Sequence, residues 1–306
     1  MDSKEKTVES DASTKAENGP KGVAPPLSPH QKIKQSIKKV EDRLAKLEKP
    51  QRDSRILALD IGVQNMAAEL FPLMAPADPV GLQFERIGRD FDGGYVMVKH
   101  DSQSRIAYSL GINRDVSWDV IMAERGYDIF QYDHTIQKLP TEHPRFHWKR
   151  KGITGKHQVT EELTSLEIEF EANGHLDATD IVLKIDIEGY EWEVFSEMSQ
   201  RDLSRFSQIL VECHSLTKLN GLARFRKMRQ SLRNLAETHQ VVHVHGNNNS
   251  PMAVVGGVPT PQTLELTWLR RDICPFVPCT RLFPTELDQP NNPNFADHKL
   301  GKFSFF

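Results

Sequence analysis

The sequence predicts an α/β fold in which a mostly parallel sheet carries helices on both faces. Short apolar runs rich in β-branched residues alternate along the chain with amphipathic stretches, which is typical of strands alternating with helices. Several runs end in an acid or a glycine, at the strand ends where open α/β sheets bind ligands. The last two runs, residues 240–245 and 263–270, have no helix between them, so we expect an antiparallel strand at the edge of the sheet.

Composition narrows the possible functions. The 306 residues carry a formal net charge of -3, so bulk electrostatics does not indicate a nucleic-acid partner. Cys213, Cys274 and Cys279 lack a CxxC spacing and make no disulfide framework, which fits a reducing compartment. The first residues contain no apolar signal segment, and no run reaches the length of a membrane span. We therefore expect a cytoplasmic protein with no membrane span and no nucleic-acid partner.

Two segments precede the expected domain. Residues 1–30 are mostly small, polar or charged, and we expect a disordered tail because they bury too little apolar surface to offset the entropy of ordering. Residues 31–50 predict an amphipathic helix. Its apolar side chains follow a heptad spacing: Ile33, Ile37, Val40, Leu44 and Leu47. Two interpretations stay open: the helix packs on its own domain, or residues 33–47 form the contact of a homodimer.

The domain is expected at residues 51–280 and begins with two turn signals. Residues 55–62 are typical of a strand that ends in Asp60 and Gly62, followed by a helix at residues 63–73. We assign no nucleotide site there, because a stronger candidate follows. A later Asp-Gly-Gly sequence, which ends at Gly94, lies between two apolar runs and predicts a hairpin turn. Alternatively, its glycines let the backbone approach a ligand.

A strand, helix and second strand at residues 105–133 carry the clearest ligand signal. The first strand ends in Gly111, a helix follows from Ser117, and the second strand ends in Asp133 about 20 residues after the glycine. A pyrophosphate needs several backbone N–H groups at close approach and hence several glycines, which are absent. A nucleoside needs only one glycine for the turn and one carboxylate for two ribose hydroxyls. The pattern favours an adenosyl ligand such as S-adenosylmethionine over NAD or FAD.

The alternation continues to the end of the domain. Residues 146–153 predict a strand with a loop at its tip, and residues 164–174 a helix. A strand at 206–214 and a long basic amphipathic helix at 222–238 follow. After Cys274 the chain is rich in Pro and Asn without periodicity, so residues 281–306 are expected as an irregular C-terminal extension.

The most informative stretch is residues 180–195. A buried strand ends at Asp186, Glu188 and a glycine, and an amphipathic helix follows. In an extended segment the two acids share a face, and carboxylates are costly to bury without a partner, so we expect a site. The alternative is that they cap the next helix and pair with Lys184 or Arg205.

Several of these segments together resemble the FkbM-type branch of the class I S-adenosylmethionine-dependent methyltransferases. The resemblance covers roughly residues 80–270 in the expected order. The chain departs from the family at His134, where a proline is usual, and in a first motif reduced to Gly111. The matching pieces are Asp92-Gly93-Gly94-Tyr95, Tyr108-Ser109-Leu110-Gly111-Ile112, Tyr132-Asp133-His134-Thr135, Leu183-Lys184-Ile185-Asp186-Ile187-Glu188-Gly189-Tyr190-Glu191-Trp192 and Leu210-Val211-Glu212-Cys213-His214. The later segment Leu287-Asp288-Gln289-Pro290-Asn291-Asn292 is similar to bacterial members associated with saccharide biosynthesis.

The resemblance implies a Rossmann-like class I methyltransferase fold with S-adenosyl-L-methionine as cofactor. Gly111 would let the methionine part of the cofactor approach, and Asp133 would bind the ribose hydroxyls. Ile153 would lie near the adenine, and Gly94 completes the expected cofactor set. Asp186 would face the charged end of the cofactor. The acceptor side would be lined by Glu188 and His214, with His245 on a neighbouring strand tip.

The implied reaction is O-methylation of a saccharide or small-molecule hydroxyl. Because a hydroxyl is a poor nucleophile at neutral pH, we expect His214 or Glu188 to take its proton, with Asp186 supporting the cofactor or the base. Asp186, Glu188 and His214 are also suitable metal ligands, but their spacing is not diagnostic and we expect no metal. The alternative function is a non-catalytic methyltransferase-fold binding module that assembles through its N-terminal helix.

Overall fold

The computed structural model describes residues 28–219 and 221–305. The described residues from 51 onward form one compact unit, and residues 28–50 belong to another. Helix α1 (Pro29–Leu59) begins in the second of these units and ends in the first. Most of the expected disordered tail, residues 1–27, lies outside the described residues.

Helix α1 carries the heptad positions expected from the sequence. Four of its apolar side chains are 50–59% exposed: Ile33, Ile37, Val40 and Leu44. The helix has 31 residues, yet none of the described helices, α1 included, is apolar enough over a sufficient length to cross a membrane. The exposed stripe of α1 is therefore a surface feature of a polar helix.

The strand expected at residues 55–62 is wrong. Residues 55–59 are the last turn of α1, and α2 (Ile61–Leu70) begins directly after Asp60. Asp60 caps α2, because its carboxylate accepts the backbone N–H of Val63 at 3.1 Å. Leu57 packs into the core, so the apolar run reflects one buried helical face. Short apolar runs fit a strand or a helix equally well by periodicity alone.

A seven-stranded sheet organises the domain, in the order β11-β14-β10-β9-β4-β5-β6. Strand β14 is antiparallel to both of its neighbours, and all other pairs are parallel. The predicted mostly parallel sheet with an antiparallel edge is therefore confirmed. The strands are β4 (Ile106–Leu110), β5 (Asp128–Tyr132), β6 (Phe146–Lys149), β9 (Ile181–Ile185), β10 (Phe206–Cys213), β11 (His239–Gly246) and β14 (Leu264–Arg270).

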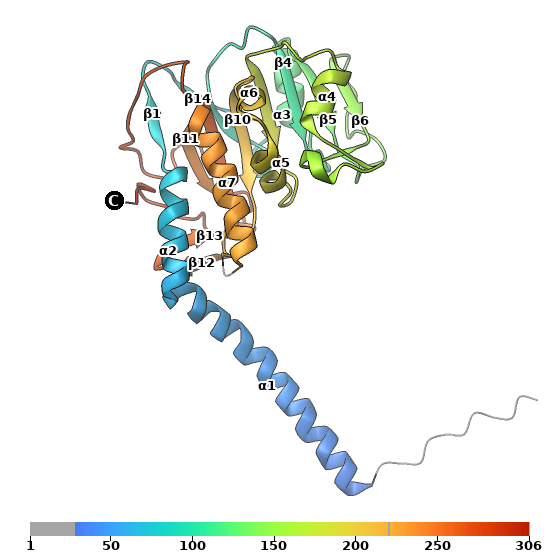
Figure 1. The fold of residues 1–306 in the computed structure, drawn as a ribbon, viewed down its shortest axis with the longest axis vertical. Helices are drawn as coiled ribbons and strands as arrows, with labels where there is room; N and C mark the ends of the chain where they lie inside the picture. Colours follow the sequence, from blue (N-terminus) through green and yellow to red (C-terminus); the bar gives the residue numbers. More distant parts are fainter. Residues whose placement is uncertain (1–27, 220, 306) are drawn as a thin grey trace, which may run out of the picture. The chain divides into compact units, whose positions relative to one another are not determined.

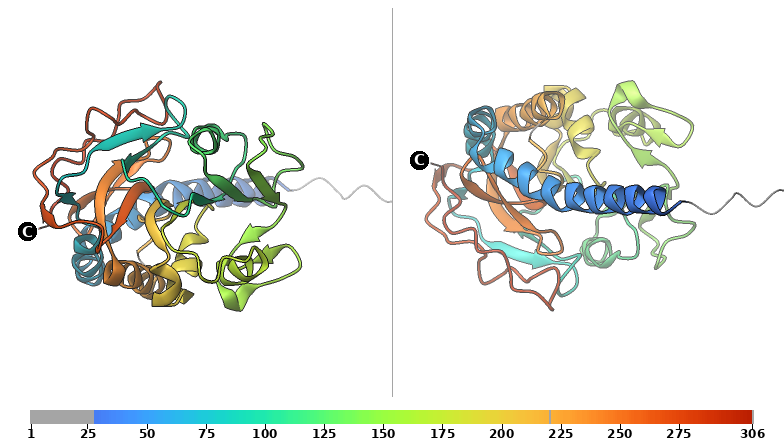
Figure 2. Two further views of the ribbon diagram at one scale, coloured as in Figure 1. Left: turned by 90° about the horizontal axis from the view of Figure 1, so that it is seen from above. Right: turned by 90° about the horizontal axis from the view of Figure 1, so that it is seen from below.

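Helices cover both faces of the sheet (Figures 1 and 2). On one face, Ala107 and Val182 pack against α3 (Ser117–Glu124). On the other, the alternate strand residues pack against a layer of helices and form the larger core. These helices are α4 (Leu166–Ala172), α5 (Glu191–Glu197), α6 (Gln200–Leu203) and α7 (Leu222–Thr238).

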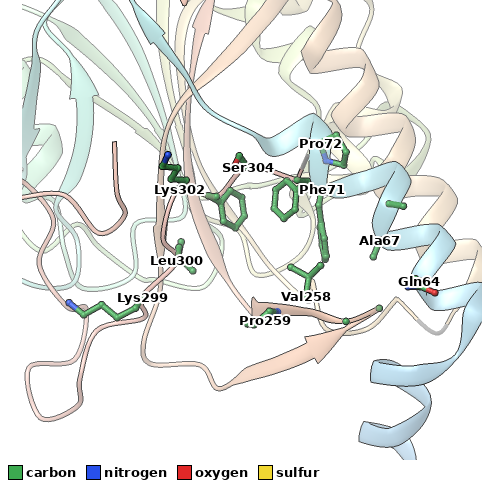
Figure 3. A pocket seen from close by; sticks show the side chains of 15 residues that line it. Gln64, Ala67, Phe71, Pro72, Val258, Pro259, Lys299, Leu300, Lys302 and Ser304 are labelled. Atoms are coloured by element: carbon green, nitrogen blue, oxygen red, sulfur yellow. The ribbon is translucent and has the colours of Figure 1, made fainter. Parts of the chain in front are cut away.

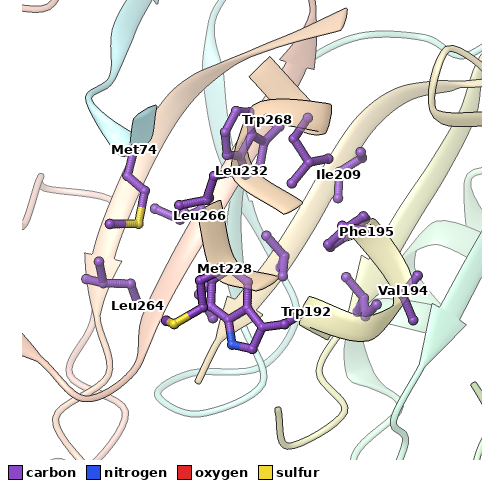
Figure 4. Close-up of a cluster of buried hydrophobic side chains, with 14 of the residues drawn as sticks. Met74, Trp192, Val194, Phe195, Ile209, Met228, Leu232, Leu264, Leu266 and Trp268 are labelled. Carbon is purple, nitrogen blue, oxygen red and sulfur yellow. The ribbon is translucent and has the colours of Figure 1, made fainter. Parts of the chain in front are cut away.

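The larger core lies between α5, α7 and strands β10 and β14 (Figure 4). Trp192 and Phe195 both point into it from α5. Leu232 of α7 and Trp268 of β14 complete the same cluster and are almost fully buried. This packing fixes α5, and with it the loop that precedes α5 at the end of β9.

Short elements surround the sheet. The predicted Asp-Gly-Gly hairpin is present, because β2 (Phe84–Ile87) and β3 (Tyr95–Val98) pair antiparallel across it. The other pairs are β1 (Ala77–Pro79) with β15 (Phe276–Pro278), β7 (Gly152–Ile153) with β8 (Leu163–Thr164), and β12 (Met252–Val255) with β13 (Val258–Pro261). Two 3-10 helices, η1 (Phe71–Met74) and η2 (Lys156–Gln158), complete the elements.

An ionic clamp joins the C-terminal segment to the edge of the sheet. His245 of β11 lies between the carboxylates of Glu265 on β14, at 2.9 Å, and Asp297, at 3.2 Å. Burial alone would lower the pKa of His245, but the two carboxylates raise it to about 10. The imidazolium therefore ties residues near 297 to β11 and β14.

Replacing His245 should make stability less dependent on pH. Because the folded pKa of His245 is about 10 and its unfolded pKa is near 6.5, its contribution is complete below pH 6.5 and disappears as the pH rises through 10. We expect the loss in free energy of unfolding caused by His245→Gln to shrink by about 2–4 kcal/mol between pH 6.5 and 10. Urea unfolding at several pH values measures this, with the half-exposed His147→Gln as control. A loss that stays constant over that range would contradict the clamp.

Candidate active site

A cavity of about 820 Å³ opens at the carboxyl ends of β4, β5 and β9. Its size suits a ligand of cofactor dimensions, and its position is where open α/β sheets bind ligands. Five residues singled out in the sequence line it together: Gly111, Asp133, Ile153, Asp186 and Glu188. The structure thus brings one turn, one ribose-binding candidate and two acids to the same site.

The turn after β4 can only be made by glycine. Gly111 has φ +80°, and a Cβ at this position would lie 1.7 Å from the backbone oxygen of Asp186. Its N–H donates to the carbonyl oxygen of Tyr132 at 3.0 Å. The ends of β4, β5 and β9 are therefore held against one another at the floor of the cavity.

Asp133 holds this turn through four hydrogen bonds. One carboxylate oxygen accepts the backbone N–H groups of Ile112 and Asn113, each at 2.8 Å. The other accepts the N–H and the hydroxyl of Thr135, at 2.7 and 2.6 Å. Burial raises the pKa of Asp133, but these donors outweigh burial and leave it below its usual value. Since a carboxylate offers about four acceptor positions, a ribose hydroxyl would have to replace one of these donors.

The far wall of the cavity is apolar. Ile153 of β7 is almost fully buried and lines it together with Leu163. His134, which stands where the family has proline, packs so closely on Gly152 that a Cβ there would lie 2.5 Å from its Nδ1 atom. The departure from the family motif is therefore matched by a glycine opposite, while the adjacent threonine keeps its bonds to Asp133.

The acidic wall lies where β9 and β10 end: Asp186 and Glu188 line the cavity there, and His214 lies next to them without lining it. Asp186 follows β9, and His214 follows β10 with its Nε2 atom 3.8 Å from an Asp186 oxygen. The same nitrogen lies 3.4 Å from an oxygen of Glu188, whose side chain is 87% exposed. Glu188 has φ +57°, a conformation that costs a residue with a Cβ about 1–2 kcal/mol. Such backbone strain is found preferentially at functional sites.

Two further acids belong to this wall, and the sequence reasoning gave them no role. Glu191 of α5 is fully buried, and one of its oxygens accepts the backbone N–H of His214 at 2.7 Å and lies 3.3 Å from Nδ1. Glu212 of β10 is buried with an oxygen 3.7 Å from Nε2 of His214. Both lie inside the motifs that carry the family resemblance, and this position was the one sequence signal that could have identified them.

Crowding of acids shifts the titration of this wall. Burial, and then the neighbouring acids, raise the pKa of Asp186 to about 6, although Lys184 and His214 oppose the shift. Burial and the charge of Asp186 raise the pKa of Glu212 well above its usual value. Burial lowers the pKa of His214, but Glu191 and the other acids outweigh it and raise the pKa overall. The carboxyl groups of Asp186 and Glu212 are therefore harder to ionise than free ones.

Three candidate residues do not line the cavity: Gly94, His214 and His245. Gly93 lines the cavity, whereas Gly94 packs against the guanidinium of Arg86. His245 does not line the cavity. Strand β14 lies between β10 and β11, so the partner of His245 is Glu265 and the expected approach to the mouth is wrong.

A second cavity, of about 550 Å³, lies between α2, η1, the turn from β12 to β13 and the C-terminal segment (Figure 3). Phe71, Pro72 and Val258 give it an apolar wall. None of its described lining residues carries a carboxylate or an imidazole. Of these two cavities, the first is therefore the one whose lining offers groups suited to proton transfer.

The close approach at Gly111 predicts a large cost for adding one methyl group. Gly126 also has a positive φ, +91°, but a Cβ there meets nothing within 4 Å. Gly126→Ala should lower the free energy of unfolding by about 1–2 kcal/mol through backbone strain alone. Gly111→Ala should lose at least about twice as much, because the strand ends must also separate. Chemical denaturation compares the two variants, and equal losses would show that the contact is unimportant.

Comparison with known proteins places the fold in a family. Residues 96–237 match the family model described as the Methyltransferase FkbM domain. No curated protein and no solved structure matches the chain. The matched range runs from β3 into α7 and includes Gly111, Asp133, Asp186 and His214. Residues 96–237 therefore form a methyltransferase domain of the FkbM family, with the Rossmann-like α/β fold expected from the sequence.

Proposed function

We propose that the protein is an S-adenosylmethionine-dependent O-methyltransferase that acts on a saccharide or small-molecule hydroxyl. The observation that supports this most is the layout of the cavity. The turn held by Asp133 and the acids Asp186 and Glu188 line the same cavity, and His214 lies beside those two acids. A cofactor and an acceptor can then meet there.

The cofactor side suits a nucleoside without phosphates. A single glycine, Gly111, makes the turn, and the apolar wall at Ile153 offers a surface for an adenine ring. Asp133 shapes the turn, and we propose that a ribose hydroxyl exchanges with one of its four donors. Asp186 offers negative charge to the sulfonium end.

The acceptor side must align a hydroxyl and remove its proton. When bound, S-adenosylmethionine supplies an activated methyl group, so that the S–CH₃ bond breaks, an O–CH₃ bond forms and the acceptor proton passes to the protein. Glu188 and His214 are the candidate proton acceptors, and their facing atoms are 3.4 Å apart. Glu191 orients His214, and the exposed carboxylate of Glu188 lies at the mouth where an acceptor enters.

A second candidate function has its own supporting observation. The exposed apolar stripe of α1, at Ile33, Ile37, Val40 and Leu44, is suited to a homodimer contact through residues 33–47. A methyltransferase fold used only for binding would assemble in this way and would not bind S-adenosylmethionine.

As part of the main proposal we place the enzyme in the cytoplasm, because its three cysteines are free.

Cofactor binding separates the two functions. Isothermal titration calorimetry should detect S-adenosylmethionine binding to the wild-type protein. Asp133→Asn should weaken it at least about tenfold, since an amide cannot accept the four hydrogen bonds that shape the turn. Asp128→Asn, at the opposite end of β5 and half exposed, is the matched control and should bind normally. A wild-type protein that binds no cofactor would support the binding module.

Methyl transfer tests the acceptor wall. Cofactor with a labelled methyl group, incubated with saccharide and small-molecule fractions of a cell extract, should yield a labelled product. Glu188→Gln or His214→Gln should lower the rate about 100-fold or more for whichever residue takes the proton, without loss of cofactor affinity. The exposed Glu161→Gln should leave the rate unchanged. Unchanged transfer in both wall variants would remove the assignment.

A further inference from the structure

Three ligand-type side chains converge where β9 and β10 end. Asp186, Glu212 and His214 each offer one atom, and these atoms all lie within 4.8 Å of one another. The convergence follows from the sheet: β9 and β10 are parallel neighbours with Ile185 paired to Val211, so the next residues, Asp186 and Glu212, lie side by side. His214 follows two residues later and turns back over them.

The imidazole of His214 is oriented with Nε2 toward the two acids. Glu191 accepts its backbone N–H at 2.7 Å and faces Nδ1 at 3.3 Å, so the ring proton belongs on Nδ1. The indole of Trp192 donates to the carbonyl oxygen of His214 at 2.9 Å and fixes the same residue from the other side. The lone pair of Nε2 then faces Asp186 and Glu212, with an oxygen of Glu188 also near, at 3.4 Å. A carboxylate behind a ligating histidine is the usual outer support of a metal site.

The two acids have acceptor positions that the described residues leave open. Among those residues, no donor bonds to the side chain of Asp186, and Glu212 accepts only from Asn247, at 2.8 Å on one oxygen. Lys184 donates to the carbonyl oxygen of Gly111 at 3.3 Å and forms no ion pair with Asp186. Two adjoining carboxylates that share a single donor are costly to remove from water unless a cation joins them.

We propose that Asp186, Glu212 and His214 bind a divalent cation, with Mn²⁺ as the best match. Two carboxylates and one imidazole give an oxygen-rich set that suits Mn²⁺ or Mg²⁺, and the imidazole favours Mn²⁺ of the two. Three protein ligands leave further coordination positions open, and one of the three, Asp186, lines the cavity.

If the proposed methyl transfer holds, a bound cation gives each residue of the acidic wall a separate role in it. An acceptor hydroxyl bound to the cation becomes more acidic, as metal-bound water does. Its O–H bond breaks, the electron pair stays on the oxygen, and the proton passes to Glu188. His214 is then a ligand, and Glu188 is the group that takes the proton.

The acidic wall has a rival counter-charge, the sulfonium or amino group of the cofactor. The two possibilities differ in one measurable property. A metal site takes up Mn²⁺ in the protein alone, whereas a wall neutralised by cofactor takes up no Mn²⁺ in its absence. Metal binding is therefore measured without S-adenosylmethionine.

Electron paramagnetic resonance of free Mn²⁺ provides the test, because the signal of the free ion disappears on binding. Wild-type protein should remove one Mn²⁺ per chain at submillimolar concentration, and Mg²⁺ should compete. Glu212→Gln and His214→Gln should weaken binding by more than about 100-fold, beyond the loss typical of an outer residue. Glu191 is a positioning residue, and Glu191→Gln should weaken Mn²⁺ binding about 10- to 100-fold. Asp133→Asn and Glu188→Gln should bind Mn²⁺ normally.

Failure of this proposal is distinct from failure of methyl transfer. A folded wild-type protein that removes no Mn²⁺ overturns the metal site, and so does equal binding by wild type and both ligand variants. Cofactor binding and methyl transfer that persist in chelator would leave the methyltransferase intact without a metal. Circular dichroism melting checks that each variant folds, and the wild-type titration decides the question even where a variant does not.

Discussion

The approach of β4 to β9 at Gly111 is the contact on which the site depends. A Cβ there would lie 1.7 Å from the carbonyl oxygen of Asp186, so the two strand ends meet only because residue 111 has no side chain. Backbone bonds hold the same place: Gly111 donates to Tyr132, and Asp186 donates to Leu110 at 2.9 Å. Three strands thus end in register on one floor. The acids that follow β5 and β9 face one cavity because their strands are fixed to each other first.

The acidic wall carries an electrostatic cost, because like charges lie close together there. Asp186 and Glu212 lie side by side on parallel strands, and the raised pKa of each reflects burial beside a like charge. The left-handed backbone at Glu188 adds strain at the same position. A well-packed cluster behind the wall, with Trp192 and Phe195 almost fully buried, compensates for both costs. Departures from local stability rules that gather at one point of a stable fold are typical of function.

Sequence reasoning reached the fold and part of the site. The period of apolar residues and the acid 22 residues after Gly111, at Asp133, are local signals, and the structure confirms the sheet that they predict. Three features were beyond such signals. Residues 55–59 are helical because Leu57 is buried on a helical face, and a short apolar run does not distinguish a helix from a strand. The position of β14 between β10 and β11 separates His245 from the cavity, and strand order is set by long-range pairing. The meeting of Glu191 with His214, 23 residues apart, depends on how α5 packs.

Asp133 explains how the turn after β4 keeps its shape with a single glycine. A glycine-rich loop keeps its shape because its backbone reaches conformations closed to other residues. Here Ile112 and Asn113 follow the single glycine, and Asn113 itself has φ +48°. The carboxylate of Asp133 accepts both of their N–H groups and so holds the turn in place. The turn therefore keeps its shape without further glycines. Thr135 holds the opposite oxygen and keeps the carboxylate ionised and aligned. Asp133, which the sequence suggested as a ligand for ribose, therefore first supports the turn. Any contact that it makes with a bound sugar depends on the turn that it holds in place.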